Sequence, residues 1–194
     1  IGIKSEWLSL VGDVFGRYIS GIAGDYLFHS VPYYSMSEED LELEEFNKLG
    51  EQASQGCVRL AVSDAKWVYD NCSTGTNVSI YDDAENAGPL GKPDAIKITD
   101  FTNKWDPTDS NKKCPYAKAT PIISGANDYT IKSGGEFYAL AGVTAVDTCG
   151  NDITSNIEVF GNVVTTRKGK YKVTYSVTDV LKRTSSVTIT VTVA

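Results

Sequence analysis

The sequence predicts a mainly β protein of two domains, in which a β-sheet domain with short helices precedes an all-β sandwich. Three observations lead to this fold class. Residues 171–177 and 186–193 alternate apolar and polar side chains, a pattern typical of half-buried strands. Strand-like and helix-like segments are mixed before residue 84. The net charge is -8 over residues 1–118 and +1 over residues 119–194, which indicates two regions of different composition.

The first region contains two expected strands and two expected helices. Residues 25–31 and 77–81 carry the apolar and β-branched side chains of strands. Residues 37–50 begin at Ser37 and end at Gly50, and therefore predict a capped helix. Residues 63–71 predict a second helix, with Ser63 as its N-cap.

A proline- and glycine-rich connector is expected over residues 84–118, between domains 1–83 and 119–194. The prolines, glycines and turn formers of residues 88–93 and 105–111 predict extended chain. The connector should nevertheless pack on a domain, because it carries four apolar side chains. These are Ile96, Ile98, Phe101 and Trp105.

The last region should be a small antiparallel sandwich, because turn-forming residues separate its strands at short intervals. The expected turns lie at residues 133–135, 149–152 and 168–170.

Composition excludes several classes of function. A net charge of -7 argues against nucleic-acid binding, which needs a basic face. No apolar stretch approaches the roughly 18 residues of a membrane helix, and no signal-peptide segment follows Ile1. The one histidine, His29, lies in no H-x-x-x-H arrangement, and no two cysteines have C-x-x-C spacing. We therefore expect no metal site, and the sequence gives no basis for an oligomeric state.

Reactive chemistry is expected at Cys57. A cysteine directly after Gly56, in a tight turn, can present its sulfur and nearby main-chain N–H groups to one substrate carbonyl. An imidazole such as that of His29 could then take the thiol proton. Arg59 adds positive charge to the same segment. Taken singly, Cys57 could equally be a buried structural thiol and His29 a core residue on a strand.

Together these segments resemble the L,D-transpeptidase catalytic domain of bacterial cell-wall enzymes, over about residues 1–83. The motifs that carry this resemblance are His29-Ser30, Ser54-x-Gly56-Cys57-x-Arg59, Asp64-Ala65-Lys66-Trp67 and Gly75-Thr76-x-Val78-x-Ile80. Residues 119–194 resemble bacterial immunoglobulin-like domains. The motifs there are Asp147-x-x-Gly150-Asn151-Asp152-Ile153-Thr154 and Gly169-x-Tyr171-x-Val173-x-Tyr175-x-Val177-x-Asp179.

The resemblance implies a catalytic apparatus that needs no metal and no organic cofactor. Cys57 is the expected nucleophile and His29 the general base, with the main-chain carbonyl of Ser30 holding the imidazole in its working tautomer. The N–H groups of Gly56 and Cys57 would hold the oxyanion. The implied reaction is 3–3 cross-linking of peptidoglycan stem peptides with release of D-alanine, in an extracytoplasmic enzyme of the bacterial wall or surface that carbapenems inhibit.

Substrate contacts are expected from four residues, Arg59, Ser54, Gln55 and Tyr33. Arg59 suits a substrate carboxylate. Gln55 stands where many family members have a second histidine, and it cannot move protons. The 24 residues between His29 and Ser54 exceed the common family spacing and are assigned to the acidic helix. Its residues 38–45 are expected to form a solvated face, in preference to a surface that steers charged wall polymer.

Several alternatives remain open from sequence. Water as acceptor would make the enzyme an L,D-carboxypeptidase, and a degenerate domain would make the protein an envelope-binding or adhesion protein. The family fold has strands ahead of the segment that begins here, so Ile1 is expected to lie inside the catalytic domain, which would leave a sheet edge exposed. Cys72 and Cys114 either form a disulfide that pins the connector or stay reduced.

Overall fold

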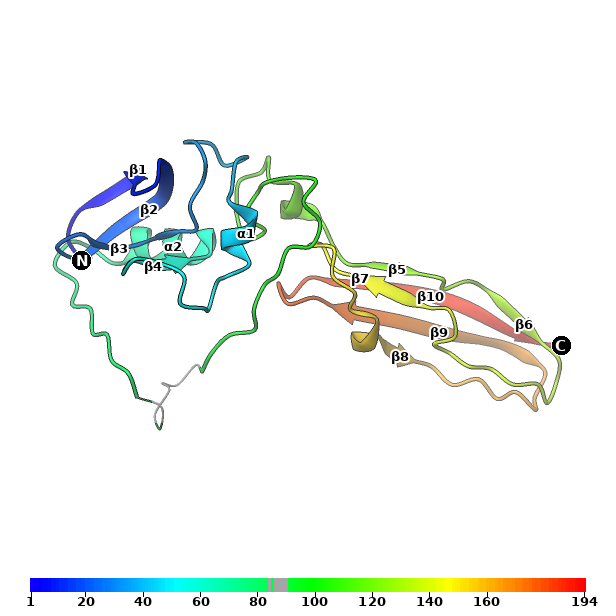
Figure 1. Ribbon diagram of the computed structural model, residues 1–194. Coiled ribbons are helices and arrows are strands. Elements are labelled where there is room, and N and C mark those ends of the chain that lie inside the picture. Colours follow the sequence, from blue (N-terminus) through cyan, green and yellow to red (C-terminus); the bar gives the residue numbers. More distant parts are fainter. Residues whose placement is uncertain (84, 86–90) are drawn as a thin grey trace. The chain divides into compact units, whose positions relative to one another are not determined.

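The computed structural model describes residues 1–83, 85 and 91–194, and it divides the chain into two compact units, Ile1–Ala117 and Lys118–Ala194 (Figure 1). Most regular structure in both units is β-strand, so the predicted mainly β fold with short helices is confirmed. Of the expected connector, the described residues up to Ala117 lie with the first unit. Residues 88–90, which carry part of its proline and glycine signal, lie outside the described residues.

A four-stranded sheet forms the centre of the first unit. Its strands are β1 (Lys4–Leu10), β2 (Val14–Ala23), β3 (Tyr26–Ser30) and β4 (Val58–Leu60), in that spatial order. The first three strands pair antiparallel, whereas β3 and β4 pair parallel. A parallel pair needs a crossover connection, and residues 31–57 supply it. The expected strand at 25–31 corresponds to β3, but residues 77–81, although described, form no strand.

Two helices accompany this sheet. Helix α2 (Val62–Asn71) packs against β2 and β3, and its place agrees with the predicted second helix (Figure 1). Helix α1 (Leu43–Phe46) is a single turn, so the predicted helix over residues 37–50 is wrong in length.

The expected cap at Ser63 is also wrong. The N-cap residue of α2 is Ala61, and the Val62 N–H donates to the Asp106 carboxylate at 2.8 Å. Local sequence could not indicate this cap, because the acceptor lies 44 residues further along the chain.

The segment that precedes the second unit packs closely on the first. Ile98 joins a buried cluster that includes Val31 and Phe46, and Trp105 is also buried, whereas Phe101 is 55% exposed. Cys72 and Cys114 are not bridged. Cys72 ends α2, while Cys114 lies beside Asp106 at the start of that helix. A ten-residue helix spans about 15 Å, which exceeds the reach of a disulfide.

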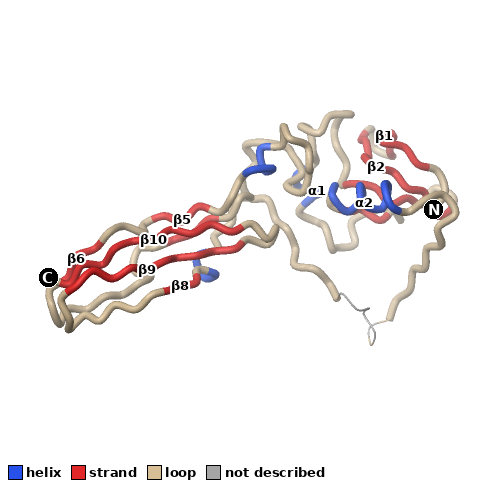
Figure 2. Tube along the Cα trace, turned by 180° about the vertical axis from the view of Figure 1, so that it is seen from behind, coloured by secondary structure: helices blue, strands red, loops and turns tan. Residues whose placement is uncertain are grey.

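The second unit consists of two small sheets with a shared core. One sheet has the order β6-β10-β9-β8 (Figure 2), and the other pairs β5 with β7. The strands are β5 (Ile122–Ser124), β6 (Tyr129–Ile131), β7 (Thr144–Val146), β8 (Glu158–Phe160), β9 (Gly169–Thr178) and β10 (Thr184–Val193). Short 3-10 helices occur at Pro115–Lys118 and Thr154–Asn156.

The long strands β9 and β10 coincide with the two alternating segments of the sequence. The turn expected at residues 168–170 lies earlier, at residues 165–167, because Gly169 already belongs to β9. Within the part of the chain that the structure describes, no helix is long and apolar enough to cross a membrane.

Candidate active site

Parallel pairing of β3 with β4 brings the histidine and cysteine segments together. His29 lies opposite Arg59 in the register, and Cys57 directly precedes β4. All three residues line one pocket of about 410 Å³, together with Gln55. The remaining wall is largely apolar and includes Leu8, Leu10, Val14, Tyr26 and Pro32. The pairing expected between the cysteine loop and His29 therefore has a structural basis, and the catalytic roles stay a prediction.

The loop before β4 is held by Ser54. Its hydroxyl donates to the main-chain oxygen of Cys57 at 2.6 Å and accepts the Gly56 N–H at 3.2 Å. Gly56 has a φ of 124°, and a Cβ at this position would overlap the Tyr26 ring. Only glycine adopts such a conformation without strain. The Ser54 hydroxyl thus acts within the loop, and the expected oxyanion donor Gly56 N–H is already engaged.

His29 is 2% exposed, and its Nδ1 lies 2.5 Å from the main-chain oxygen of Ser30, which is the contact expected from sequence. A carbonyl can only accept, so this contact places the imidazole proton on Nδ1 and leaves the Nε2 lone pair available. The pKa of His29 is lowered to about 4, chiefly because the ring is buried; the Ser30 contact raises it in part, and the Arg59 charge adds to the lowering. His29 is therefore neutral at pH 7.

Arg59 forms an ion pair with Glu45 on the short helix α1, at 2.5 Å. Glu38, at the other end of the acidic segment, also has a partner, because it lies 3.1 Å from the guanidinium of Arg17. The expectation that residues 38–45 form a solvated face is therefore wrong for these two carboxylates. Each of them instead holds the crossover connection against the sheet.

Tyr33 is not a substrate-groove residue. Its side chain is 0% exposed and packs edge-on against Trp7, with ring centroids 5.2 Å apart. Its main chain bridges to Phe15, which fixes the residue in the core of the unit. The neighbouring Tyr34 is exposed instead.

A second pocket, of about 290 Å³, also contacts the cysteine loop. It shares Cys57, Ser54 and Arg59 with the first pocket. The charged residues that line it are Glu45, Lys48, Glu51 and Arg59. Cys57 therefore borders two pockets, of which the smaller is lined by several charged side chains of both signs.

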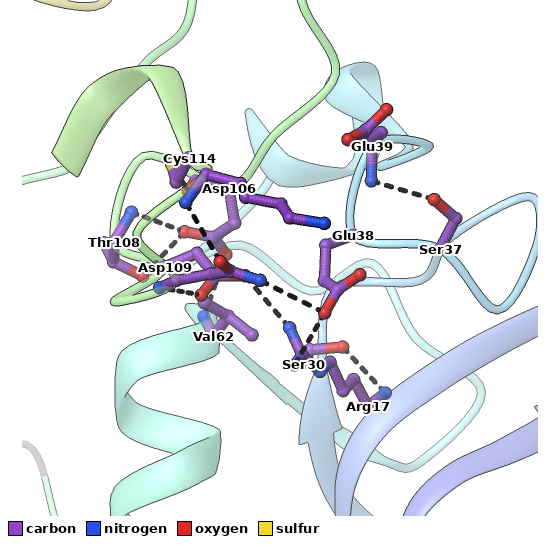
Figure 3. A network of polar contacts seen from close by, with 12 residues as sticks. Arg17, Ser30, Ser37, Glu38, Glu39, Val62, Asp106, Thr108, Asp109 and Cys114 are labelled. Carbon is purple, nitrogen blue, oxygen red and sulfur yellow. Dashed lines mark hydrogen bonds and ion pairs between the residues drawn. The ribbon is translucent and has the colours of Figure 1, made fainter.

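Sequence reasoning missed a buried polar network behind the site (Figure 3). Its centre is Arg17, whose guanidinium lies 2.9 Å from Asp109 and 3.1 Å from Glu38. Asp106, which caps α2, also accepts hydrogen bonds from the N–H and hydroxyl of Thr108. An arginine inside an otherwise apolar strand was the one available signal, since a buried charge needs partners.

No group of three or more histidine, cysteine, aspartate or glutamate side chains among the described residues could hold a metal ion.

Comparison with known proteins agrees with both resemblances. Residues 12–80 match the L,D-transpeptidase catalytic domain, and residues 121–193 match the Ig-like domain of bacterial surface proteins. The chain thus combines an L,D-transpeptidase-like segment with a bacterial surface Ig-like segment. A similar protein is "Putative L,D-transpeptidase YciB" of Bacillus subtilis (strain 168), which is 47% identical over 57 residues. This match covers 29% of the chain and 28% of that relative.

One similar solved structure contains CBM51-2 and INT domains from Clostridium perfringens ZmpB in complex with GlcNAc. It is 31% identical to this chain, and the match covers 38% of this chain and 16% of that chain, with a TM-score of 0.35. A lipoprotein from Bacteroides thetaiotaomicron is 25% identical over 38% of this chain and 37% of its own, with a TM-score of 0.34.

Proposed function

We propose that the first unit is a cysteine-dependent L,D-transpeptidase that forms 3–3 cross-links in peptidoglycan outside the cytoplasm. The observation that carries this proposal is the shared pocket of Cys57 and His29, with the imidazole held by Ser30 and neutral at pH 7. A neutral imidazole with a free Nε2 lone pair is the form that accepts a thiol proton. The family match over residues 12–80 supports the same chemistry.

In the acylation step, His29 Nε2 takes the Cys57 proton, and the sulfur attacks the carbonyl carbon of the third residue of a tetrapeptide stem. The oxyanion accepts from the N–H of Cys57, because that of Gly56 is engaged with Ser54. The C–N bond then breaks, and terminal D-alanine leaves with the proton from the imidazolium. A thioester between Cys57 and the stem remains.

In the second step an amine of a neighbouring stem attacks the thioester, His29 takes the amine proton, and the sulfur leaves as the thiol after reprotonation. The smaller pocket beside Cys57 favours transfer over hydrolysis, because it offers room for a second substrate next to the thioester. Arg59, which also borders this pocket, suits a stem carboxylate.

Intact-protein mass spectrometry after incubation with a carbapenem or a tetrapeptide stem tests the proposal. We expect one adduct on the native protein, mapping to Cys57, and none on Cys57→Ala. Cys72→Ala is the matched control, because Cys72 is the other partly exposed cysteine. It should acylate like the native protein.

The opposite result would be a native protein whose Cys57 reacts with iodoacetamide but gains no adduct from either probe. That outcome would reject acylation and favour an envelope-binding protein. An adduct that hydrolyses at the same rate with and without an added acceptor amine would favour the L,D-carboxypeptidase.

A further inference from the structure

Residues that follow the L,D-transpeptidase match are buried in the same unit as the candidate active site. The match ends at residue 80, yet Asp106 and Asp109 are both buried in the first unit. Asp106 caps α2, and Asp109 lies against Arg17 of strand β2 (Figure 3). Burying carboxylates is costly unless they are paired, so these contacts define how this segment packs.

Arg17 is held on several sides. Its side chain is nine-tenths or more buried, with the guanidinium 2.9 Å from Asp109 and 3.1 Å from Glu38. The guanidinium also lies over the rings of Trp7 and Tyr18, at 5.3 and 4.6 Å from their centroids. Of the two close carboxylates, that of Asp109 is the more buried and the nearer, so it is the main fixed partner of this charge.

Arg17 pairs with Trp7 of β1, but the pairing of β2 with β3 stops before it. The register of β2 with β3 covers Ser20 to Ala23. Before this stretch, the Arg17 N–H donates to the hydroxyl of Ser30 at 2.9 Å instead of to a main-chain carbonyl. Tyr18 has a φ of 54°, a left-handed conformation that is strained for this residue type and persists only where surrounding contacts hold it. The buried ion pair of the preceding residue is such a contact.

This bend contacts the imidazole directly. A Cβ on Gly16 would lie 3.2 Å from His29 Nδ1, so the main chain at Gly16 packs against the ring. The same nitrogen contacts the Ser30 carbonyl, and the hydroxyl of that serine accepts a hydrogen bond from the Arg17 N–H. Arg17 is therefore connected to both partners of this contact, to Ser30 by its own N–H and to the imidazole through the neighbouring Gly16.

We propose that Asp109 is a positioning residue for His29, which acts by fixing Arg17 and with it the bend of β2 against the imidazole. The inference rests on the proposed function for its catalytic meaning. It assigns a role in the active site to a segment outside the family match. Asp109 is not expected to contact substrate.

The test uses the fact that His29 is the one histidine of the chain, so its ring nitrogens give unambiguous NMR signals in the full-length protein. The native protein should show the Nδ1–H tautomer. Asp109→Asn keeps the size of the side chain and removes its charge. We expect a mixture of both tautomers and acylation of Cys57 that is about ten-fold slower or more, the scale of loss for a misplaced catalytic group.

Asp40→Asn is the matched control. It removes a carboxylate that pairs with Lys104 of the same segment at 3.2 Å but does not contact Arg17. A purely structural role would make both variants alike, with a lower melting temperature and an unchanged His29 tautomer. A native tautomer in folded Asp109→Asn would overturn the proposal.

Arg17→Lys keeps the inference testable if Asp109→Asn does not fold. Lysine retains the charge but cannot offer the planar guanidinium fork, so the tautomer mixture should appear here too. Retention of the native tautomer in this variant would also count against the proposal. The NMR measurement needs no enzymatic activity, so its failure is distinct from failure of the native protein to form a carbapenem adduct.

Discussion

Replacing Asp106 by asparagine should change how the stability of the first unit depends on pH. Asp106 is fully buried, and burial raises its pKa from 3.8 to about 6 despite the hydrogen bonds from Val62 and Thr108. Between about pH 4 and pH 6 the folded protein keeps a proton that the unfolded chain has lost. The free energy of unfolding therefore falls as pH rises through this window, by about 3 kcal/mol for a shift of this size.

His29 acts in the opposite direction. Its pKa falls from 6.5 in the unfolded chain to about 4 in the folded protein, so the unfolded chain takes up a proton that the folded protein does not. The free energy of unfolding then rises with pH between about 4 and 6.5, again by about 3 kcal/mol. In the native protein these two dependences largely cancel.

Asp106→Asn removes the pH dependence that comes from Asp106 and leaves the one that comes from His29. Near pH 4 the variant should be less stable than the native protein by only about 1 kcal/mol. The loss is small because asparagine still offers an oxygen to the Val62 N–H. By pH 7 the difference should have shifted by about 3 kcal/mol in favour of the variant, because only the native protein then carries the buried charge.

Urea unfolding followed by tryptophan fluorescence measures the free energy of unfolding of the first unit. All three tryptophans, Trp7, Trp67 and Trp105, lie in that unit, and the second unit has none. Taking the difference between variant and native protein at each pH removes the contribution of every other titrating group. A difference that stays constant from pH 4 to pH 7 would show that folding does not change the pKa of Asp106, and would refute the reasoning.

Three further outcomes are expected. Gly56→Ala should lower the free energy of unfolding of the first unit by about 1–3 kcal/mol and slow acylation of Cys57. The new Cβ would overlap the Tyr26 ring, and a φ of 124° is strained for alanine. Acylation at the native rate would contradict this prediction. Glu45→Gln should change the melting temperature little and, by freeing Arg59, lower the KM for stem peptides about three-fold; a higher KM would show that the ion pair aids binding. Tyr175→Phe should lower the free energy of unfolding of the second unit by about 1 kcal/mol, measured by calorimetry, because the Tyr175 hydroxyl donates to the partly buried main-chain oxygen of Ala139 at 2.7 Å; an unchanged second-unit transition would argue against that bond.

Features that depend on neighbouring residues were predictable from the sequence. The period-2 alternation of residues 171–177 and 186–193 marks the long strands β9 and β10, because each side chain faces the core or solvent according to its own position in the strand. Helix α2 was likewise recognisable from its own residues. The Gly56-Cys57 turn follows from a short local motif, whereas the contact between Ser30 and His29 was expected from the resemblance to the L,D-transpeptidase family.

Features that depend on distant partners were decided by the tertiary structure alone. The single-turn helix α1 sits in a crossover whose carboxylates Glu38 and Glu45 pair with Arg17 and Arg59 from separate strands. The acceptor that caps α2 comes from Asp106, far along the chain. Charged groups find their lowest free energy with whichever opposite charge folding brings near, and no pattern within a short window of sequence contains that information.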